Sequence, residues 1–456
     1  MKFIKNNRKE GEDILMEITL LGAVTIIVSI YAFFKNEKLL LYMMVFLSTF
    51  TAANLLNITV TTTPVQTFEF TGAIWLLRVF INFIKSKPKI TKGWIINKFK
   101  ENKLATAFLI FTIAIILGEI FLLISGINVE YTNADGELSV LKFGKANITM
   151  PIIMIFIFVN MLVLSFTIKT KEEVKELLKV FSFSTMFAVV WGLLQFITYY
   201  FGVPYPEFLF NNNVYAMQWY NQIDNNVKRI TSIALEPSMF AINLVCFIPF
   251  VLGTYLKLKE KMKEKKYIIT FIILVLTTAC AILTTSTTTY VGIVAIYGMF
   301  GLYILFGFIK KGELDNRKRN FLKMLLVTVC SIGFAACVCI GSLKIGYRLG
   351  TIQPIKIEVK EEDKDKDKED EYNSAFQNMV KMVKQMTIDK LGSGSGQERM
   401  KGEEVGMKLF KHSPIVGIGI GSYRTFSMFT NVLLNMGIVR NSFTFIYLIC
   451  NFKSII

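Results

Sequence analysis

The sequence has little charge for its length: 19% of its 456 residues are charged, whereas 53% are hydrophobic. A soluble protein of this length would form two or three domains and would carry more charge. The apolar residues instead gather in blocks close to the roughly 20 residues that a helix needs to cross a bilayer. The composition therefore argues against an ordinary soluble protein and predicts an all-α integral membrane protein.

Cysteine is scarce and shows no pattern. The six cysteines all fall inside apolar blocks, without the spacing of a metal site or of a disulfide framework. We interpret them as small core or lipid-facing residues rather than as redox groups. The polar residues 1–16 also lack the cleavage pattern of a signal peptide.

The formal net charge of +17 comes largely from lysines in short loops between apolar blocks. A membrane protein marks its cytoplasmic side in this way, so we favour that interpretation over nucleic-acid binding. The basic loops are 85–103, 169–179, 257–266 and 310–319, and they alternate with the acidic or nearly neutral segments 125–149, 202–228, 286–288 and 345–427. The first set is predicted to be cytoplasmic and the second to face outward.

Eleven apolar blocks are candidate membrane spans. They lie at about 17–34, 39–59, 66–84, 104–124, 150–168, 180–201, 231–256, 267–285, 288–309, 321–343 and 428–450. Residues 1–343 are thus predicted to hold about ten spans, 344–427 a large extracytoplasmic loop, and 428–456 the last span and a short tail. Eleven spans would place the N-terminus outside, whereas its basic residues favour the cytoplasmic side. Either Met16 is the true start or the first two blocks are misjudged.

Two outward segments are long enough to have structure. Residues 202–228 are rich in aromatic residues and asparagine, which favours a headgroup anchor over stacking on sugar rings. In the large loop, a charged linker at 358–371 contains twelve consecutive charged residues and lacks the glycine and spacing of an EF-hand calcium loop. Apolar residues at helical spacing predict an amphipathic helix over 376–386, and a second helix is predicted from Gln397 to Lys411, ending at the Ser413-Pro414 pair.

Three glycines alternate at 417, 419 and 421 after this helix. A dinucleotide fingerprint would require a third, later glycine at position 422, which is Ser422, and a preceding strand of a βαβ unit. The pattern instead predicts a tight outward turn in which backbone amides approach a ligand or a helix.

Three motifs together resemble the O-antigen ligase/polymerase family of membrane glycan transferases. They are GQERMKGEEVGMKLFKHSPIVGIGIGSY at 396–423, RITSIALEPSMFAINL at 229–244 and the weaker LTTSTTTYVG at 283–292. The resemblance implies a GT-C-like multi-helix fold at the cytoplasmic membrane. It also implies transfer of an oligosaccharide from undecaprenyl diphosphate to an acceptor sugar hydroxyl at the outer face, with neither a metal nor another cofactor. Flippase and chain-length regulator proteins are its expected partners.

The resemblance favours a polymerase. A ligase would carry a catalytic histidine just before an asparagine, where this chain has Thr430 and Asn431. The alternatives are ligase-like transfer to a wall, lipid or protein acceptor, and a lipid-linked-oligosaccharide flippase or transporter, although no inverted repeat is visible. A sensor would need a cytoplasmic domain, and no cytoplasmic loop exceeds about 20 residues. Members of the family usually continue beyond the position of Ile456, so a shortened chain is one of the alternatives.

The expected site follows from the chemistry of a diphosphate leaving group, which planar arginine side chains bind bidentately. Glu236, expected about two helical turns after Arg229 and inside the bilayer, would orient that arginine or activate the acceptor hydroxyl, unless the two only form a packing ion pair. His412, the single histidine, would cap a helix end. The candidate catalytic residues are Arg229, Glu236 and Arg399, and the candidate substrate-binding residues are Arg424, His412, Tyr423, Asn431 and Ser286.

Overall fold

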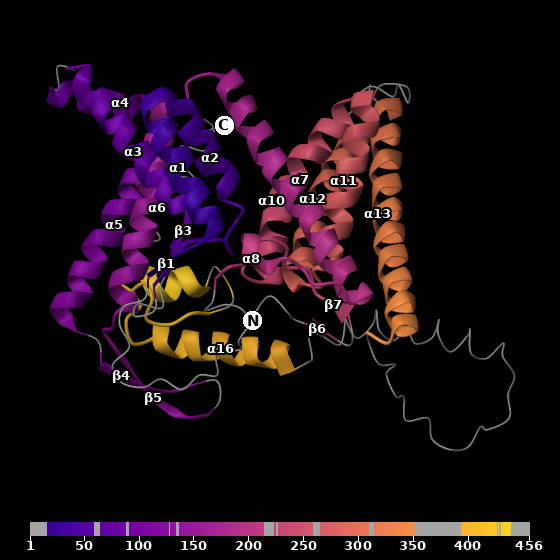
Figure 1. Ribbon diagram of the computed structural model, residues 1–456. Coiled ribbons are helices and arrows are strands. Elements are labelled where there is room, and N and C mark those ends of the chain that lie inside the picture. The colour runs from indigo at the N-terminus through magenta and orange to yellow at the C-terminus, as the bar shows by residue number, and fades with distance from the viewer. Residues whose placement is uncertain are drawn as a thin grey trace, which may run out of the picture. The chain divides into compact units, whose positions relative to one another are not determined.

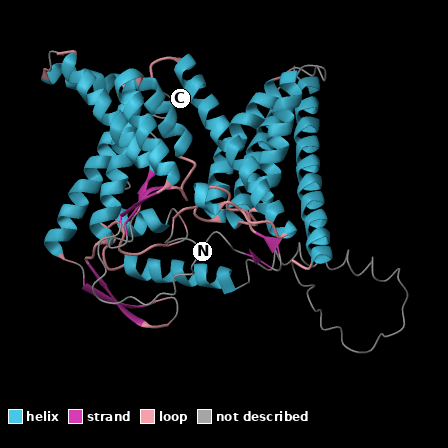
Figure 2. Cartoon of the chain, in the orientation of Figure 1, coloured by secondary structure: helices cyan, strands magenta, loops and turns pink. Residues whose placement is uncertain are grey.

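The computed structural model describes residues 16–58, 64–87, 91–126, 128–133, 136–213, 223–224, 227–258, 265–309, 314–351, 394–425, 427 and 430–438. These residues are mostly helical (Figure 1, Figure 2). Among them, seven helices are long and apolar enough to cross a membrane. The helical multi-pass class is thus supported, whereas the predicted number of eleven spans stays a prediction.

The chain forms two compact units. The first contains residues 1–79 and 175–366, and the second contains residues 80–174 and 367–456. The main helices of the first unit are α1 Leu20–Lys35, α2 Glu37–Leu47, α3 Thr67–Lys85, α7 Lys171–Phe201, α8 Glu207–Phe210, α10 Pro237–Lys257, α11 Lys265–Leu283, α12 Thr287–Ile309 and α13 Leu314–Leu349, with α3 and α7 crossing the boundary between units. Its strands are β1 Met16–Ile18, β2 Asn54–Ile58, β3 Val65–Gln66, β6 Ile223–Asp224 and β7 Val227–Lys228.

Helices α10 to α13 pack as a bundle, with α11 against both α10 and α13. At one end Tyr255 and Tyr267 share a hydrogen bond of 2.8 Å between their hydroxyls. At the other end the backbone of Ile230 donates to Leu283 O at 3.4 Å, and Thr351 Oγ1 donates to Tyr200 O at 2.7 Å. The segments predicted to face outward in this unit therefore gather at one end of the bundle.

The first two predicted spans, 17–34 and 39–59, are shorter in the structure. Helix α1 has 16 residues and α2 has 11, and Asn36 separates them by capping α2 through the backbone N–H of Leu39. Residues 54–58 form β2, which pairs antiparallel with β1 in the register Met16↔Ile58. The prediction of a helical span through residue 59 is wrong, because these apolar residues are buried as strand and turn instead of extending α2.

The second unit contains two of the candidate spans, α5 Lys103–Ser125 and α6 Ala146–Thr167, which pack on each other. Between them, β4 Asn128–Thr132 and β5 Leu138–Lys142 form a hairpin that the sequence analysis did not predict. The short helix α4 Lys92–Glu101 precedes α5. Helix α16 Gly394–Phe410 packs against β4 and lies crosswise to α5 and α6 (Figure 1).

Several predictions concern the large loop and the last span. The helix predicted from Gln397 to Lys411 is confirmed as α16, which begins inside the glycine-serine run. Helix α13 continues to Leu349, so the segment that follows it starts later than the predicted residue 344. The charged linker 358–371 and the helix over 376–386 lie outside the described residues. Of the last predicted span, 428–450, residues 430–438 are described and are helical.

A substitution at Gly22 tests the packing of α1 on β2. A Cβ at Gly22 would clash with Leu55 O, a backbone atom that cannot move without displacing the strand. We expect Gly22→Ala to lower the free energy of unfolding by about 1–3 kcal/mol, the cost of overpacking, and therefore to lower the thermal unfolding midpoint in detergent. Gly298→Ala in α12 is the control, because a Cβ there meets no atom within 4 Å. Equal midpoints for the two variants would contradict this packing.

Candidate functional site

The segment 229–236 carries two of the predicted catalytic residues, and it is not helical. Helix α10 begins only at Pro237, and Glu236 is its N-cap in an extended conformation (φ −147°, ψ 160°). The prediction that Glu236 lies two helical turns after Arg229 is therefore wrong. The physical reason is Pro237, since proline suits the first helical position and restricts the preceding residue to extended backbone.

Gln195 in α7 supplies the hydrogen bonds that this segment cannot make as a helix. Its Oε1 accepts from the backbone N–H groups of Thr231 and Ser232, both at 2.9 Å, and its Nε2 donates to Thr231 Oγ1 at 2.8 Å. The Gln195 side chain is buried, and Ser232 adopts a left-handed backbone with φ 54°. Backbone groups that are buried away from water and not paired within a helix need partners of this kind.

Other parts of the first unit also form hydrogen bonds with the segment 229–236. Asn211 Nδ2 donates to Ser232 O at 2.6 Å, and Ser232 Oγ donates to Ala188 O at 2.5 Å. The backbone N–H of Ala52 donates to Ile233 O at 3.0 Å. Residues distant in sequence thus hold the segment in one conformation, which preorganises the side chains that it carries.

Arg229 is half-buried and lies against the serine/threonine-rich turn between α11 and α12. Its Nε donates to Thr284 O at 3.3 Å, and Thr284 Oγ1 lies 2.8 Å from Thr289 Oγ1. The predicted candidate Ser286 is in this turn and is 1% exposed. Two of the three sequence motifs, distant along the chain, are therefore adjacent in the structure.

Lys228 precedes Arg229 and was not recognised as a candidate in the sequence analysis. Its side chain is 2% exposed, and its Nζ lies 5.5 Å from the centroid of the Tyr199 ring. Its backbone N–H donates to the Tyr200 hydroxyl at 3.0 Å. Burial lowers the pKa of the Lys228 amine to about 8, and the Glu207 carboxylate opposes this shift. The only signal in the sequence was a second cation next to the motif arginine.

A cavity of about 210 Å³ surrounds the Lys228 side chain, within the first unit. Its lining comes from the C-terminal turns of α7, from the residues that follow it and from β7. The lining residues are Gln195, Thr198, Tyr199, Gly202, Val203, Tyr205, Glu207 and Lys228. Most of these side chains carry a hydrogen-bonding group, although the larger part of the surface that lines the cavity is apolar.

In the second unit, the glycine turn has the predicted tight conformation. Gly417, Gly419 and Gly421 have φ values of 80°, 95° and 90°. The backbone N–H groups of residues 418 and 419 donate to Leu434 O and Asn435 O in the following helical segment, at 3.0 and 3.1 Å. The next N–H, of residue 420, donates to Glu119 Oε1 in α5 at 3.0 Å. Glu119 is an intramembrane carboxylate that the sequence analysis missed, and here it holds the turn.

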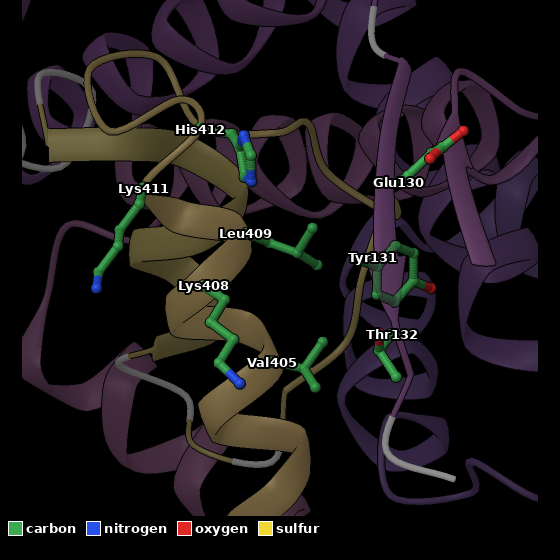
Figure 3. A pocket seen from close by; sticks show the side chains of 8 residues that line it. All are labelled: Glu130, Tyr131, Thr132, Val405, Lys408, Leu409, Lys411 and His412. Carbon is green, nitrogen blue, oxygen red and sulfur yellow. The ribbon is translucent and has the colours of Figure 1, made fainter. Parts of the chain in front are cut away.

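A groove of about 450 Å³ lies between α16 and β4 (Figure 3). Val405 and Leu409 point from the helix toward the strand, whereas Lys411 points away (Figure 3). Both apolar side chains belong to a core cluster with Leu141 and Ile418. The groove is lined by Glu130, Tyr131, Thr132, Val405, Lys408, Leu409, Lys411 and His412, so it has an apolar floor and a charged rim. His412 is exposed and follows the end of α16, with its backbone N–H on Leu409 O.

The remaining predicted residues are also in the second unit. Tyr423 donates to Gly402 O at 3.4 Å and its ring packs edge-on against Tyr131. Asn431 Oδ1 accepts from the backbone of Thr425 and from the side chain of Asn435, which commits it to local structure. Arg424 is exposed, and Arg399 lies on α16.

Among the described residues, no group of three or more His, Cys, Asp or Glu side chains is placed to hold a metal ion. Comparisons of the chain with protein families, curated proteins and solved structures found no match.

Replacing Gln195 by leucine tests whether it holds the segment that carries Arg229. The variant leaves two buried backbone N–H groups and a hydroxyl without their partner, and each such loss costs about 1–3 kcal/mol. We expect Gln195→Leu to unfold in detergent at a clearly lower temperature than wild type. Leu194→Val, at the adjacent and partly exposed position of the same helix, should change it little. An unchanged midpoint for Gln195→Leu would show that the segment is held by other contacts.

The lowered pKa of Lys228 predicts a pH dependence of stability. Below pH 8 the amine is protonated in both folded and unfolded chains, and folding bears the full cost of burying the charge. As the pH rises from about 8 to the ordinary value of 10.5, the folded state binds fewer protons than the unfolded state, so stability rises.

Lys228→Met removes this titration. We expect the variant to unfold at a higher temperature than wild type at pH 7.5, and the difference to narrow by pH 10. The exposed Lys401→Met serves as control, since it should follow wild type throughout. A Lys228→Met difference that stays constant between the two pH values would contradict the lowered pKa.

Proposed function

We propose that the protein is a polymerase of cell-surface polysaccharide. It transfers glycan from undecaprenyl diphosphate to an acceptor sugar hydroxyl at the outer face of the cytoplasmic membrane. The observation that carries the proposal is Arg229, held on a rigid non-helical segment against the Thr284 turn at one end of the first unit's bundle. The resemblance of the three motifs to the O-antigen ligase/polymerase family supports the same class.

The transfer requires stabilisation of a departing diphosphate. The bond between the anomeric carbon and the diphosphate oxygen breaks, a bond from the acceptor oxygen to that carbon forms, and the hydroxyl proton passes to a base. The lipid diphosphate leaves with the bonding electron pair. Arg229 suits this step because a guanidinium presents five N–H donors in a fixed plane, a geometry that matches the oxygens of a diphosphate. Donors fixed before the reaction give the largest electrostatic stabilisation.

Glu236 is the proposed acceptor of the hydroxyl proton. Its carboxylate lies at the N-cap of α10 and accepts a hydrogen bond from Ser238 Oγ. This bond orients one oxygen of the carboxylate, and a general base has to be held in a fixed orientation toward the proton that it accepts. The resemblance also implies roles in catalysis or substrate binding for Arg399, Arg424 and His412.

A polymerase is preferred to a ligase on the residues at the start of the last helical segment. Position 430 is threonine where a ligase would carry its histidine, and the Asn431 side chain is engaged with Thr425 and Asn435. Transport remains the alternative class, and the same assay separates it from transfer.

The test is a reconstituted assay with purified undecaprenyl-diphosphate-linked oligosaccharide. Wild type should lengthen the glycan into a ladder, and Arg229→Ala should slow this by about 100-fold or more, as expected when one preorganised donor is lost. Arg229→Lys should also be slow, because an ammonium lacks the planar fork. Arg348→Ala, at an exposed position at the end of α13, is the matched control and should behave as wild type.

Other outcomes distinguish the alternatives. Transfer of single blocks to a different acceptor would indicate a ligase. Lipid that changes leaflet without consumption of the diphosphate would overturn the transferase proposal in favour of a flippase.

A further inference from the structure

The cavity around Lys228 has no part in the transfer step described above. Its innermost side chains are buried: Gln195 and Lys228 are each 2% exposed, and Thr198 is 8% exposed. Tyr199 and Tyr205 are half-buried and line it as well, whereas Gly202 and Val203 are exposed. The cavity is therefore lined by buried polar side chains and by aromatic side chains, and it is exposed where Gly202 and Val203 lie.

We propose that this cavity binds one pyranose ring of the lipid-linked glycan. The proposal rests on the proposed function, and it names the part of the substrate that the cavity receives. At about 210 Å³ the cavity is smaller than the roughly 300–1,000 Å³ pockets that enclose drug-sized ligands, so it suits a single ring rather than an oligosaccharide.

The chemistry of the lining matches a polyhydroxylated ring. A sugar needs donors and acceptors around its edge and an apolar surface against its face. The Lys228 ammonium and the amide nitrogen of Gln195 are donors, and the Glu207 carboxylate is an acceptor. The Thr198 hydroxyl donates its proton to Leu194 O, so it can offer only its acceptor lone pair. The Tyr199 ring, over which Lys228 Nζ already lies, offers an aromatic surface.

The lining is also fixed in place. Tyr205 OH donates to Asn211 Oδ1 at 3.2 Å, and its ring packs on Trp191 at 5.6 Å between centroids. Gln195 is held by its bonds to Thr231 and Ser232. Rigid side chains reduce the entropy that binding would otherwise cost.

The charges of the cavity favour a neutral sugar. Lys228 contributes one positive charge and Glu207 one negative charge, and the carboxylate raises the pKa of the amine through their attraction. Because the two charges offset each other, the cavity as a whole has no excess charge to attract an acidic sugar. Its selectivity is expected to come from hydrogen bonds to hydroxyl groups.

The position of the cavity relative to Arg229 fits a sugar attached to a diphosphate. Lys228 and Arg229 are consecutive, with Cα atoms about 3.8 Å apart. The Lys228 side chain reaches the end of α7, whereas the Arg229 side chain reaches Thr284. One short stretch of backbone thus presents a sugar-binding group and a diphosphate-binding group to neighbouring parts of one substrate.

The test compares the binding of two probes to the detergent-solubilised full chain. The first is undecaprenyl-diphosphate-linked oligosaccharide with neutral sugars, and the second is undecaprenyl diphosphate without sugar. We expect Glu207→Gln and Lys228→Met to weaken the sugar-bearing lipid about tenfold each, the effect of one lost hydrogen bond to a charged group, without changing affinity for the bare lipid. Arg229→Ala should weaken both probes.

A third variant addresses the shape of the cavity. Val203→Trp at the exposed edge should close the cavity to a ring, and it should affect the sugar-bearing lipid alone. Arg348→Ala again serves as control. The inference is overturned if the cavity variants weaken both probes equally or neither. If wild type binds neither probe, the proposed function itself fails, and this outcome differs from one in which Arg229→Ala is defective and the cavity variants are not.

Discussion

The hydrogen bonds of Gln195 are the interaction on which the first unit's candidate site depends. Residues 229–236 do not form a helix, so their backbone groups need partners outside the segment. Three hydrogen bonds with this one buried side chain satisfy the backbone N–H groups of Thr231 and Ser232 and engage the Thr231 hydroxyl, two and three positions after Arg229. If these bonds were lost, the segment would have to find water or refold, and Arg229 would lose its fixed position.

The rest of the site follows from this non-helical segment. Because residues 228 and 229 lie in extended backbone rather than in a helix, their side chains reach different neighbours, the end of α7 and the Thr284 turn. A helix would have placed them about 100° apart on one cylinder, with neither the cavity nor the contact to the turn. A polar side chain also holds non-helical backbone in the second unit. There Glu119, in the candidate span α5, accepts a hydrogen bond from a backbone N–H of the glycine turn.

Parts of the fold could be predicted from particular residues. The apolar runs at 104–124 and 150–168 predicted α5 and α6, and the Ser413-Pro414 pair predicted the end of α16 to within a few residues. The glycines at 417, 419 and 421 predicted positive φ values, because only glycine adopts them at low cost. Where prediction failed, apolar content was taken for helix: residues 54–58 form a strand, and residues 231–236 precede a helix that starts at a proline.

The sequence by itself determined the helical membrane class, the positions of most long helices and the turn chemistry, because hydrophobic length, proline and glycine act locally. It also marked Arg229 and the 283–292 turn as separate motifs. Only the tertiary structure decided that these two lie together, that Gln195 and Glu119 hold non-helical backbone, and that Lys228 is buried beside Tyr199 in a cavity. These features join residues that are far apart in the sequence, and contacts over such separations depend on how helices pack, which no local pattern encodes.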